Sequence, residues 1–149
     1  MTFFLIYIRI NMCIGANRLE EAEKCTRQAL RLGLSTPSVL RELAMAYMSV
    51  DKLSVAEELI RRAMAQEMIA QDSNRANPVT RKLLADVLAG QNNAVLAVQE
   101  YQAVLADDRA DMATRKMAGE RCMTLLNSLG RNEEIRSLRK IMDSLKEFD

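Results

Sequence analysis

Histidine is absent from this chain of 149 residues. Because histidine is the usual general base near neutral pH and the commonest metal ligand, its absence argues against most hydrolases and zinc sites. The sequence also has no phosphate-binding loop, dinucleotide fingerprint or nucleophile elbow. It therefore predicts a protein that is not an enzyme, with no cofactor, no metal and no small-molecule substrate.

Glycine, proline and aromatic residues are scarce, at five residues, two residues and 4% of the chain. A strand-and-turn fold needs more turn residues and more aromatic or β-branched side chains than this composition supplies. The hydrophobic content of 49% is still enough to bury a core. We therefore expect an all-α chain that forms one domain over residues 1–149.

The charges nearly cancel, because 21 basic and 20 acidic side chains leave a net charge of +1. No strong field should attract nucleic acid or anionic lipid non-specifically. The three cysteines are odd in number and form no Cys-x-x-Cys motif. A complete set of disulfides is therefore excluded, and reduced thiols in the cytoplasm are expected.

The opening segment MTFFLIYI is apolar for only about eight residues before Arg9, whereas a membrane span needs roughly 20. We expect apolar packing in a first helix over residues 3–16, although Arg9 interrupts the face that this helix would bury. The remnant of a membrane-proximal segment is an alternative interpretation, and non-native sequence is another.

Apolar residues at three- and four-residue spacing then predict further helices. Asn17 stands three residues before Glu20, which resembles the cap of a helix that runs to about Leu32 and ends at Gly33. The buried face of this helix is predicted to consist of Leu19, Ala22, Cys25, Ala29 and Leu32.

The stretch from residue 37 to 68 predicts a hairpin of two amphipathic helices. Thr36 and Pro37 should cap and start its first helix, and Asp51 should cap the second after a turn at Val50. Its buried residues are predicted to be Leu40, Leu43, Ala44, Tyr47, Leu53, Ala56, Ile60 and Ala63.

Equivalent residues recur at a fixed distance. Ala22 and Ala56 are 34 residues apart, as are Leu19 and Leu53, and this period indicates a helical repeat. The next offset is 41 residues, and the seven extra residues equal about two helical turns. We therefore expect the second helix to continue to about Gln71, with the next helix starting at Asn77-Pro78.

A third hairpin is expected to turn at residues 90–93. In the fourth, a loop and cap at 106–111 precede a helix over residues 112–129, in which Met117 and Ala118 take the roles of Leu43 and Ala44. The last helix should run from Asn132 to about residue 148 and bury Ile135, Leu138, Ile141 and Leu145. The four predicted hairpins span about 3–33, 37–71, 78–106 and 111–148.

The 34-residue period, with Leu-Ala-x-x-Tyr in one helix and Ala-x-x-x-Ile in its partner, resembles the tetratricopeptide repeat (TPR). Residues 37–70 match best, and the resemblance extends in part over 17–142. It implies a right-handed superhelix, or α-solenoid, whose first helices line a concave groove for a protein or peptide. The residues that this register directs into the groove are Tyr7, Asn11, Arg41, Met45, Met48, Lys82, Asp86, Arg115 and Met123.

Under this resemblance Arg41, Lys82 and Arg115 share one repeat position and form a basic ladder. The chain is then expected to be a scaffold or adaptor that binds a segment with acidic side chains, for example within a secretion or polysaccharide-export system. The methionines would supply adaptable apolar contacts. The alternative is that these are ordinary solvated cations and core methionines.

Two other functions stay open at this point: a helical-repeat module that binds nucleic acid, and a regulatory domain of a larger enzyme. The apolar face of the last helix has nothing beyond it in the chain to cover its flank. This suggests either a piece of a longer array or association with a second copy or a partner. Contact with a membrane is expected only through a tether outside this chain.

Overall fold

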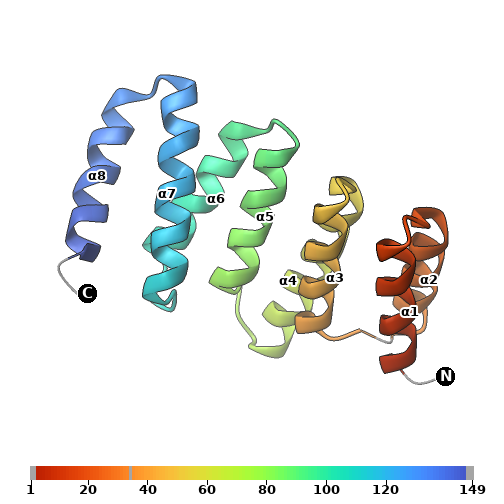
Figure 1. Cartoon of the computed structure of the whole chain (residues 1–149). Helices are drawn as coiled ribbons and strands as arrows, with labels where there is room; N and C mark the ends of the chain where they lie inside the picture. Colours follow the sequence, from red (N-terminus) through yellow and green to blue (C-terminus); the bar gives the residue numbers. More distant parts are fainter. Residues whose placement is uncertain (1–2, 34, 147–149) are drawn as a thin grey trace. The chain divides into compact units, whose positions relative to one another are not determined.

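The computed structural model describes residues 3–33 and 35–146, and this part of the chain contains eight α-helices and no strand (Figure 1). The predicted all-α class is therefore confirmed. The helices are α1 (Phe3–Gly15), α2 (Leu19–Arg31), α3 (Pro37–Ser49), α4 (Leu53–Ala70), α5 (Pro78–Gly90), α6 (Ala94–Ala106), α7 (Met112–Leu129) and α8 (Asn132–Lys146). The predicted end of the last helix, near residue 148, lies outside the described residues.

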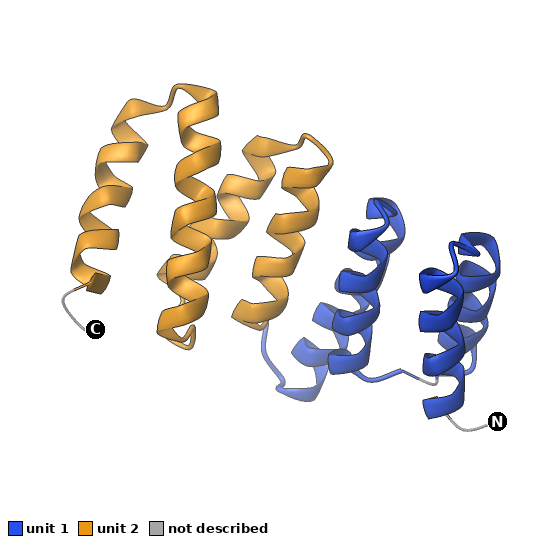
Figure 2. Ribbon diagram, viewed as in Figure 1, with its two compact units in different colours: residues 1–74 blue, residues 75–149 orange. Residues whose placement is uncertain are grey.

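The chain divides into two compact units, residues 1–74 and residues 75–149, which we call unit 1 and unit 2 (Figure 2). Each unit consists of two hairpins, and in each hairpin consecutive helices pack against each other. Helix α4 continues to Ala70, so the predicted extension of about two turns is confirmed.

All four turns within the hairpins have the same backbone geometry. One residue adopts a left-handed conformation, and the amide of the next residue donates to the carbonyl five residues earlier. This is the bonding pattern of a Schellman motif. The left-handed residues are Asn17, Asp51, Asn92 and Gly130, with φ of 60°, 62°, 62° and 67°. The amide bonds run from Arg18 to Cys13, Lys52 to Tyr47, Asn93 to Leu88 and Arg131 to Leu126, at 2.8, 2.9, 2.9 and 3.2 Å.

These turns correct two predicted helix caps. Asn17 and Asp51 do not cap the helices that follow them, because each occupies the left-handed position of the turn. The N-cap positions belong to Arg18 and Lys52, and neither side chain makes a capping bond. Asparagine and aspartate tolerate a positive φ better than other residues with a side chain, which explains why they occur here.

The caps between hairpins follow the prediction more closely. The Asn77 side chain accepts from the Val79 amide at 2.9 Å, and Asp111 accepts from the Thr114 amide at 2.7 Å. This bond holds the pKa of Asp111 below its usual value. Thr36 stands at the N-cap of α3 and is followed by Pro37, as predicted, but its side chain makes no capping bond.

In unit 1, α1 forms a regular helix whose inner face is unbroken. Ile6, Ile10, Cys13 and Ile14 are buried, and Arg9 is exposed. Arg9 therefore does not interrupt the buried face, contrary to the prediction. Leu32 was predicted to be buried but is 60% exposed, because α2 ends at Arg31.

In unit 2, α6 packs against both α5 and α7, α7 packs against α8, and α5 makes a smaller contact with α7. The core between these helices is filled by fully buried side chains, including Val87, Val98, Tyr101, Val104 and Leu126. This arrangement places an apolar helix between two first helices of neighbouring hairpins.

The register of α7 differs from the prediction. Met117 was expected to take the role of the buried Leu43, but it is 41% exposed. Leu43 lies eight residues before the left-handed Asp51. The residue eight before the left-handed Gly130 is Cys122, which is fully buried. The difference arises because α7 is four residues longer than α5 at its N-terminal end: α7 begins 18 residues before its left-handed turn residue, Gly130, and α5 begins 14 residues before Asn92.

Among the described residues, no helix combines the length and the apolar character that crossing a bilayer requires.

Candidate partner-binding surfaces

The nine residues predicted to line a groove divide between the two units. Tyr7, Asn11, Arg41, Met45 and Met48 belong to unit 1. Lys82, Asp86, Arg115 and Met123 belong to unit 2. The structure brings together members of each set within its own unit.

In unit 1, the neighbouring helices α1 and α3 present three of the predicted residues. The Tyr7 hydroxyl donates to Glu42 Oε2 at 2.8 Å, and the Asn11 amide donates to the Tyr7 carbonyl at 2.9 Å. The bond to Glu42 raises the pKa of Tyr7. Met45 is 48% exposed. It lies six residues before the left-handed Asp51, just as Asn11 lies six residues before the left-handed Asn17. These contacts link the accessible faces of α1 and α3, which we call the α1–α3 surface (Tyr7, Asn11, Glu42 and Met45).

Arg41 is already paired within unit 1. Its guanidinium forms an ion pair with Glu67 of α4, and the Glu67 side chain is only 7% exposed. A buried carboxylate needs such a partner, because desolvation of an unpaired charge is costly. Arg41 therefore joins α3 to α4. Met48, the remaining predicted residue in this unit, is half-buried.

In unit 2, Asp86 is a hub that joins three helices. It accepts from Lys82 of α5 at 3.3 Å, from Arg121 of α7 at 2.5 Å and from the Tyr101 hydroxyl of α6. Burial, and then the bond to Asp86, raises the pKa of Tyr101. Asp86 and Lys82 have side chains only 10% and 12% exposed. They consequently stabilise the packing of unit 2.

Arg121 was not among the predicted site residues. Its pKa is raised chiefly by the bond to Asp86, and its side chain remains 45% exposed. The sequence distance of 35 residues between these partners gives no local signal. Only the packing of α5 against α7 brings them together.

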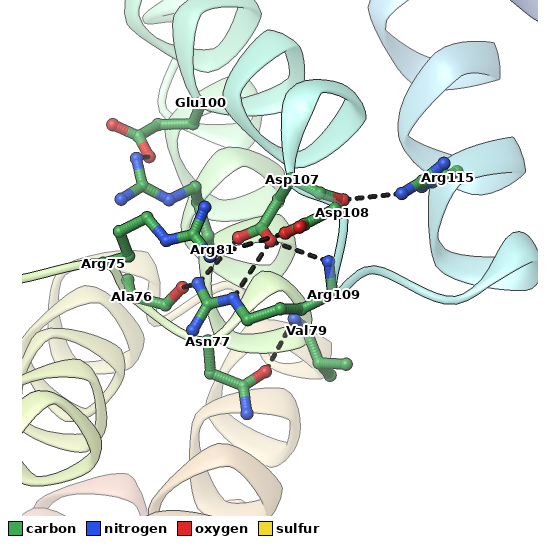
Figure 3. A network of polar contacts seen from close by, with 10 residues as sticks. All are labelled: Arg75, Ala76, Asn77, Val79, Arg81, Glu100, Asp107, Asp108, Arg109 and Arg115. Carbon is green, nitrogen blue, oxygen red and sulfur yellow. Dashed lines mark hydrogen bonds and ion pairs between the residues drawn. The ribbon is translucent and has the colours of Figure 1, made fainter. Parts of the chain in front are cut away.

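Arg115 lies at one edge of a polar network in the loops of unit 2 (Figure 3). It donates to the Asp107 carbonyl at 2.8 Å. The guanidinium of Arg109 lies between the Asp107 carboxylate, at 2.7 and 3.0 Å, and the Ala76 carbonyl, at 2.8 Å. The bonds from Arg109 lower the pKa of Asp107 to about 2. The network ties the segment before α5 to the loop between α6 and α7.

The predicted basic ladder is therefore not a row of unpaired cations, since Arg41, Lys82 and Arg115 each have an acceptor within their own unit. Arg115 also does not share the repeat position of the other two. Arg41 and Lys82 each lie ten residues before the left-handed turn residue of their hairpin. In α7 the residue at this position is Glu120. Met123 is half-buried.

Unit 1 has a second apolar surface on the outer side of α1. Leu5, Ile8 and Met12 are 54%, 36% and 69% exposed, and they line a groove of about 560 Å³ together with Arg9 and Arg18. The sequence predicted self-association through an uncapped end at the other terminus of the chain. There, Ile141 of α8 is 45% exposed, although it was predicted to be buried.

The three cysteines of the chain stand at positions 13, 25 and 122. Cys13 and Cys122 are buried, Cys25 is half-buried, and all three are free. Burial raises the pKa of Cys122 to about 11, which keeps it a thiol at neutral pH. Within residues 3–33 and 35–146, no group of three histidine, cysteine, aspartate or glutamate side chains is placed to hold a metal ion.

Comparison of the chain with protein-family models, with curated proteins and with solved structures finds no match.

Proposed function

We propose that the chain is a TPR-like helical repeat that binds a segment of another protein and has no catalytic activity of its own. The observation that carries this proposal is the recurrence of one turn geometry in all four hairpins. A turn repeated at this level of detail supports a repeat architecture, and stacked repeats typically act through extended binding surfaces.

The α1–α3 surface of unit 1 is the part of the chain best suited to such binding. Tyr7 and Asn11 offer polar groups, and Met45 offers a flexible, polarisable side chain that adapts to different apolar partners. Helical surfaces of this composition accept an amphipathic helix or an extended segment.

The proposal does not depend on an acidic partner. Arg41 and Lys82 already pair with Glu67 and Asp86, so a partner carboxylate would have to displace a buried one. Reversing either charge would also place a second carboxylate beside a buried one, Glu67 or Asp86, which makes these positions unsuitable for testing binding.

Met45→Glu tests the proposed surface. The full chain is used as bait, and co-purifying proteins are quantified by mass spectrometry for the wild type, Met45→Glu and Gln28→Glu. Gln28 is exposed on α2 and serves as the matched control for an added carboxylate. We expect a discrete set of proteins that the wild type and Gln28→Glu retain and Met45→Glu loses, with unchanged helicity in all three.

Retention of every partner by Met45→Glu would show that the α1–α3 surface is not used. Capture of RNA with a steep dependence on salt, in place of proteins, would instead favour nucleic-acid binding, because phosphate contacts release counterions.

A further inference from the structure

The outer side of α1 in unit 1 carries an apolar stripe with one charge at its centre. Leu5, Ile8, Arg9 and Met12 follow one another at spacings of one to four residues that place them on one face of the helix. Together with Ala16 they line the groove of about 560 Å³, which we call the α1 groove. More than half of Leu5 and of Met12 is exposed, so a large apolar side chain stands in solvent on either side of Arg9.

The corresponding position is covered in the other hairpins. Arg9 lies eight residues before the left-handed Asn17 and is exposed. Leu43, Leu84 and Cys122 lie eight residues before the left-handed residues of their own turns, and all three are buried. In unit 2, helix α6 of the preceding hairpin packs against α7, and its side chains line a pocket together with Cys122. The type of element that covers this face in unit 2 is therefore a helix.

The composition of α1 also indicates a helix that is packed on two sides. Its one charged residue is Arg9, whereas six of the 13 residues of α2 are charged. Helix α6 likewise has a single charged residue, Glu100, and it packs against both α5 and α7. Helices that are apolar on more than one face are normally covered on each of them. In unit 1, α1 packs against α2 and to a smaller extent α3, and its outer stripe remains open.

Arg9 determines which chemistry a covering segment needs. In the part of the chain that the structure describes, Arg9 takes part in no hydrogen bond and no ion pair. It differs in this from Arg41 and Lys82, which have acidic partners. A segment that covered the groove with apolar side chains alone would bury an unpaired guanidinium, which is costly. A carboxylate at the centre of the segment would instead accept charge-assisted hydrogen bonds from Arg9.

A second copy of the chain does not supply this charge. Arg9 is the seventh of the 13 residues of α1, so two α1 helices packed along their stripes would bring Arg9 against Arg9 in either direction. The exposed side of α8 carries three cations, Arg136, Arg139 and Lys140, and one nearby acid, Asp143. Packing of α8 on the groove would therefore also gather cations, and like charges at an interface are unfavourable.

We propose that the α1 groove binds an amphipathic helix of another protein, in which one glutamate or aspartate pairs with Arg9 and apolar side chains on either side contact Leu5 and Met12. Leu5 and Met12 are seven residues apart, or roughly 10 Å along α1, so two turns of the partner helix cover the stripe. The inference rests on the proposed function, because it names the chemistry of one partner segment. It uses a different side of α1 from the α1–α3 surface, so the two assignments can fail separately.

Synthetic helices test the proposal on the full chain. The probe is a capped, alanine-based peptide of about 18 residues, long enough to form a helix, with one glutamate between two leucines on the same face. Matched peptides carry glutamine or lysine in place of the glutamate. NMR shifts of the methyl groups of Leu5, Ile8 and Met12 report binding. We expect saturable shifts, with the glutamate peptide bound roughly tenfold more tightly than the glutamine peptide and the lysine peptide bound most weakly.

Three variants connect this order to the groove. Arg9→Glu, at an exposed position, should reverse the order, so that the lysine peptide binds most tightly. Lys24→Glu makes the same change of charge at an exposed position of α2 outside the groove, and it should keep the order of the wild type. Met12→Gln should weaken all three peptides without changing their order. Three equal affinities, no saturable shift with any peptide, or an unchanged order in Arg9→Glu would overturn the proposal.

Two other occupants of the groove give different results. Sedimentation that shows a dimer of the wild type and a monomer of Met12→Gln would assign the groove to a second copy. Binding of the wild type to vesicles of phosphatidylcholine and phosphatidylserine, lost in Met12→Gln, would assign it to a membrane surface. Either result would overturn the proposal.

The groove and the proposed function also fail separately. If Met45→Glu loses partners but no peptide shifts the groove methyl groups, only the groove assignment is wrong. If the peptides bind in the expected order but the full chain captures no protein, the groove assignment stands and the scaffold function is wrong.

Discussion

Unit 1 and unit 2 share the same turns but join their hairpins by different means. In unit 1, the hairpins meet through the Tyr7–Glu42 bond, the buried contact of Tyr47 with Thr26, and ion pairs on the surface. In unit 2, α6 packs against both α5 and α7, and the Asp86 carboxylate joins all three helices.

This difference separates what local sequence determines from what packing determines. The turns depend on one residue that tolerates a positive φ and on bonds within seven residues, so each hairpin can form them independently. The junction between hairpins depends on the size of single buried side chains and on where a buried charge finds its partners. Repeats can therefore keep one turn while their junctions diverge.

The largest expected effect is that of Asp86→Ala in unit 2. The change leaves Lys82 and the Tyr101 hydroxyl without their acceptor in a largely buried place, so we expect a loss of about 3 kcal/mol. Glu42→Ala, which removes the acceptor of Tyr7 at an exposed position of unit 1, should cost about 0.5 kcal/mol or less. Hydrogen exchange measures protection in each unit separately. Equal losses in the two variants would contradict the contrast between a buried and an exposed junction.

The second prediction compares the two buried tyrosines. Tyr101→Phe removes a donor to a charged carboxylate, for which we expect a loss of about 2 kcal/mol. Tyr47→Phe removes a bond between two neutral hydroxyls, and Thr26 keeps its bond of 2.8 Å to the Ala22 carbonyl. Its cost should be about 1 kcal/mol. Urea unfolding of both variants gives the comparison, and a larger loss for Tyr47→Phe would reverse it.

The sequence predicted the local features of both units well. Periodicity gave the eight helices, and the 41-residue offset gave the extension of α4 to Ala70. Asn17 and Asp51 were assigned to caps because the same residue types suit both a cap and a left-handed turn, and only backbone geometry distinguishes them.

The candidate site was less predictable, because it depends on contacts between distant residues. The pairing of Arg41 with Glu67 and the gathering of Lys82 and Arg121 around Asp86 follow from which helices pack together. The basic ladder failed at Arg115 because α7 is longer than α5, so the spacing of apolar residues alone gave the wrong register there.

The third prediction concerns acid and the loop network of unit 2. The folded-state pKa of Asp107, about 2, lies below its ordinary value of 3.8. The stabilisation that this shift represents is therefore present above pH 4 and is lost as the pH falls towards 2. We expect Asp107→Asn to cost on the order of 1 kcal/mol at pH 6, with the difference from the wild type much reduced by pH 2.

The matched control for the acid effect is Asp108→Asn. The Asp108 side chain is 84% exposed and lies 3.4 Å from Arg75, so its removal should change the melting temperature little at any pH between 6 and 2. Thermal melts across this range are the measurement. A constant gap between the wild type and Asp107→Asn would mean that the carboxylate does not titrate as the network requires.

The smallest expected effect sharpens the comparison at the position ten residues after the left-handed turn residue, which is Arg27 in unit 1 and Gln102 in unit 2. Arg27 and Glu58 lie 3.3 Å apart with side chains 51% and 37% exposed, so Arg27→Ala should cost about 0.5 kcal/mol or less. That cost should vanish in 1 M salt, where screening acts within about 3 Å. Gln102→Ala removes the corresponding bridge in unit 2, but its donor is uncharged, so its similarly small cost should change less with salt. Urea unfolding at low and high salt measures both costs. If Arg27→Ala costs as much in 1 M salt as without it, the bridge in unit 1 stabilises by packing of the arginine stem rather than by charge.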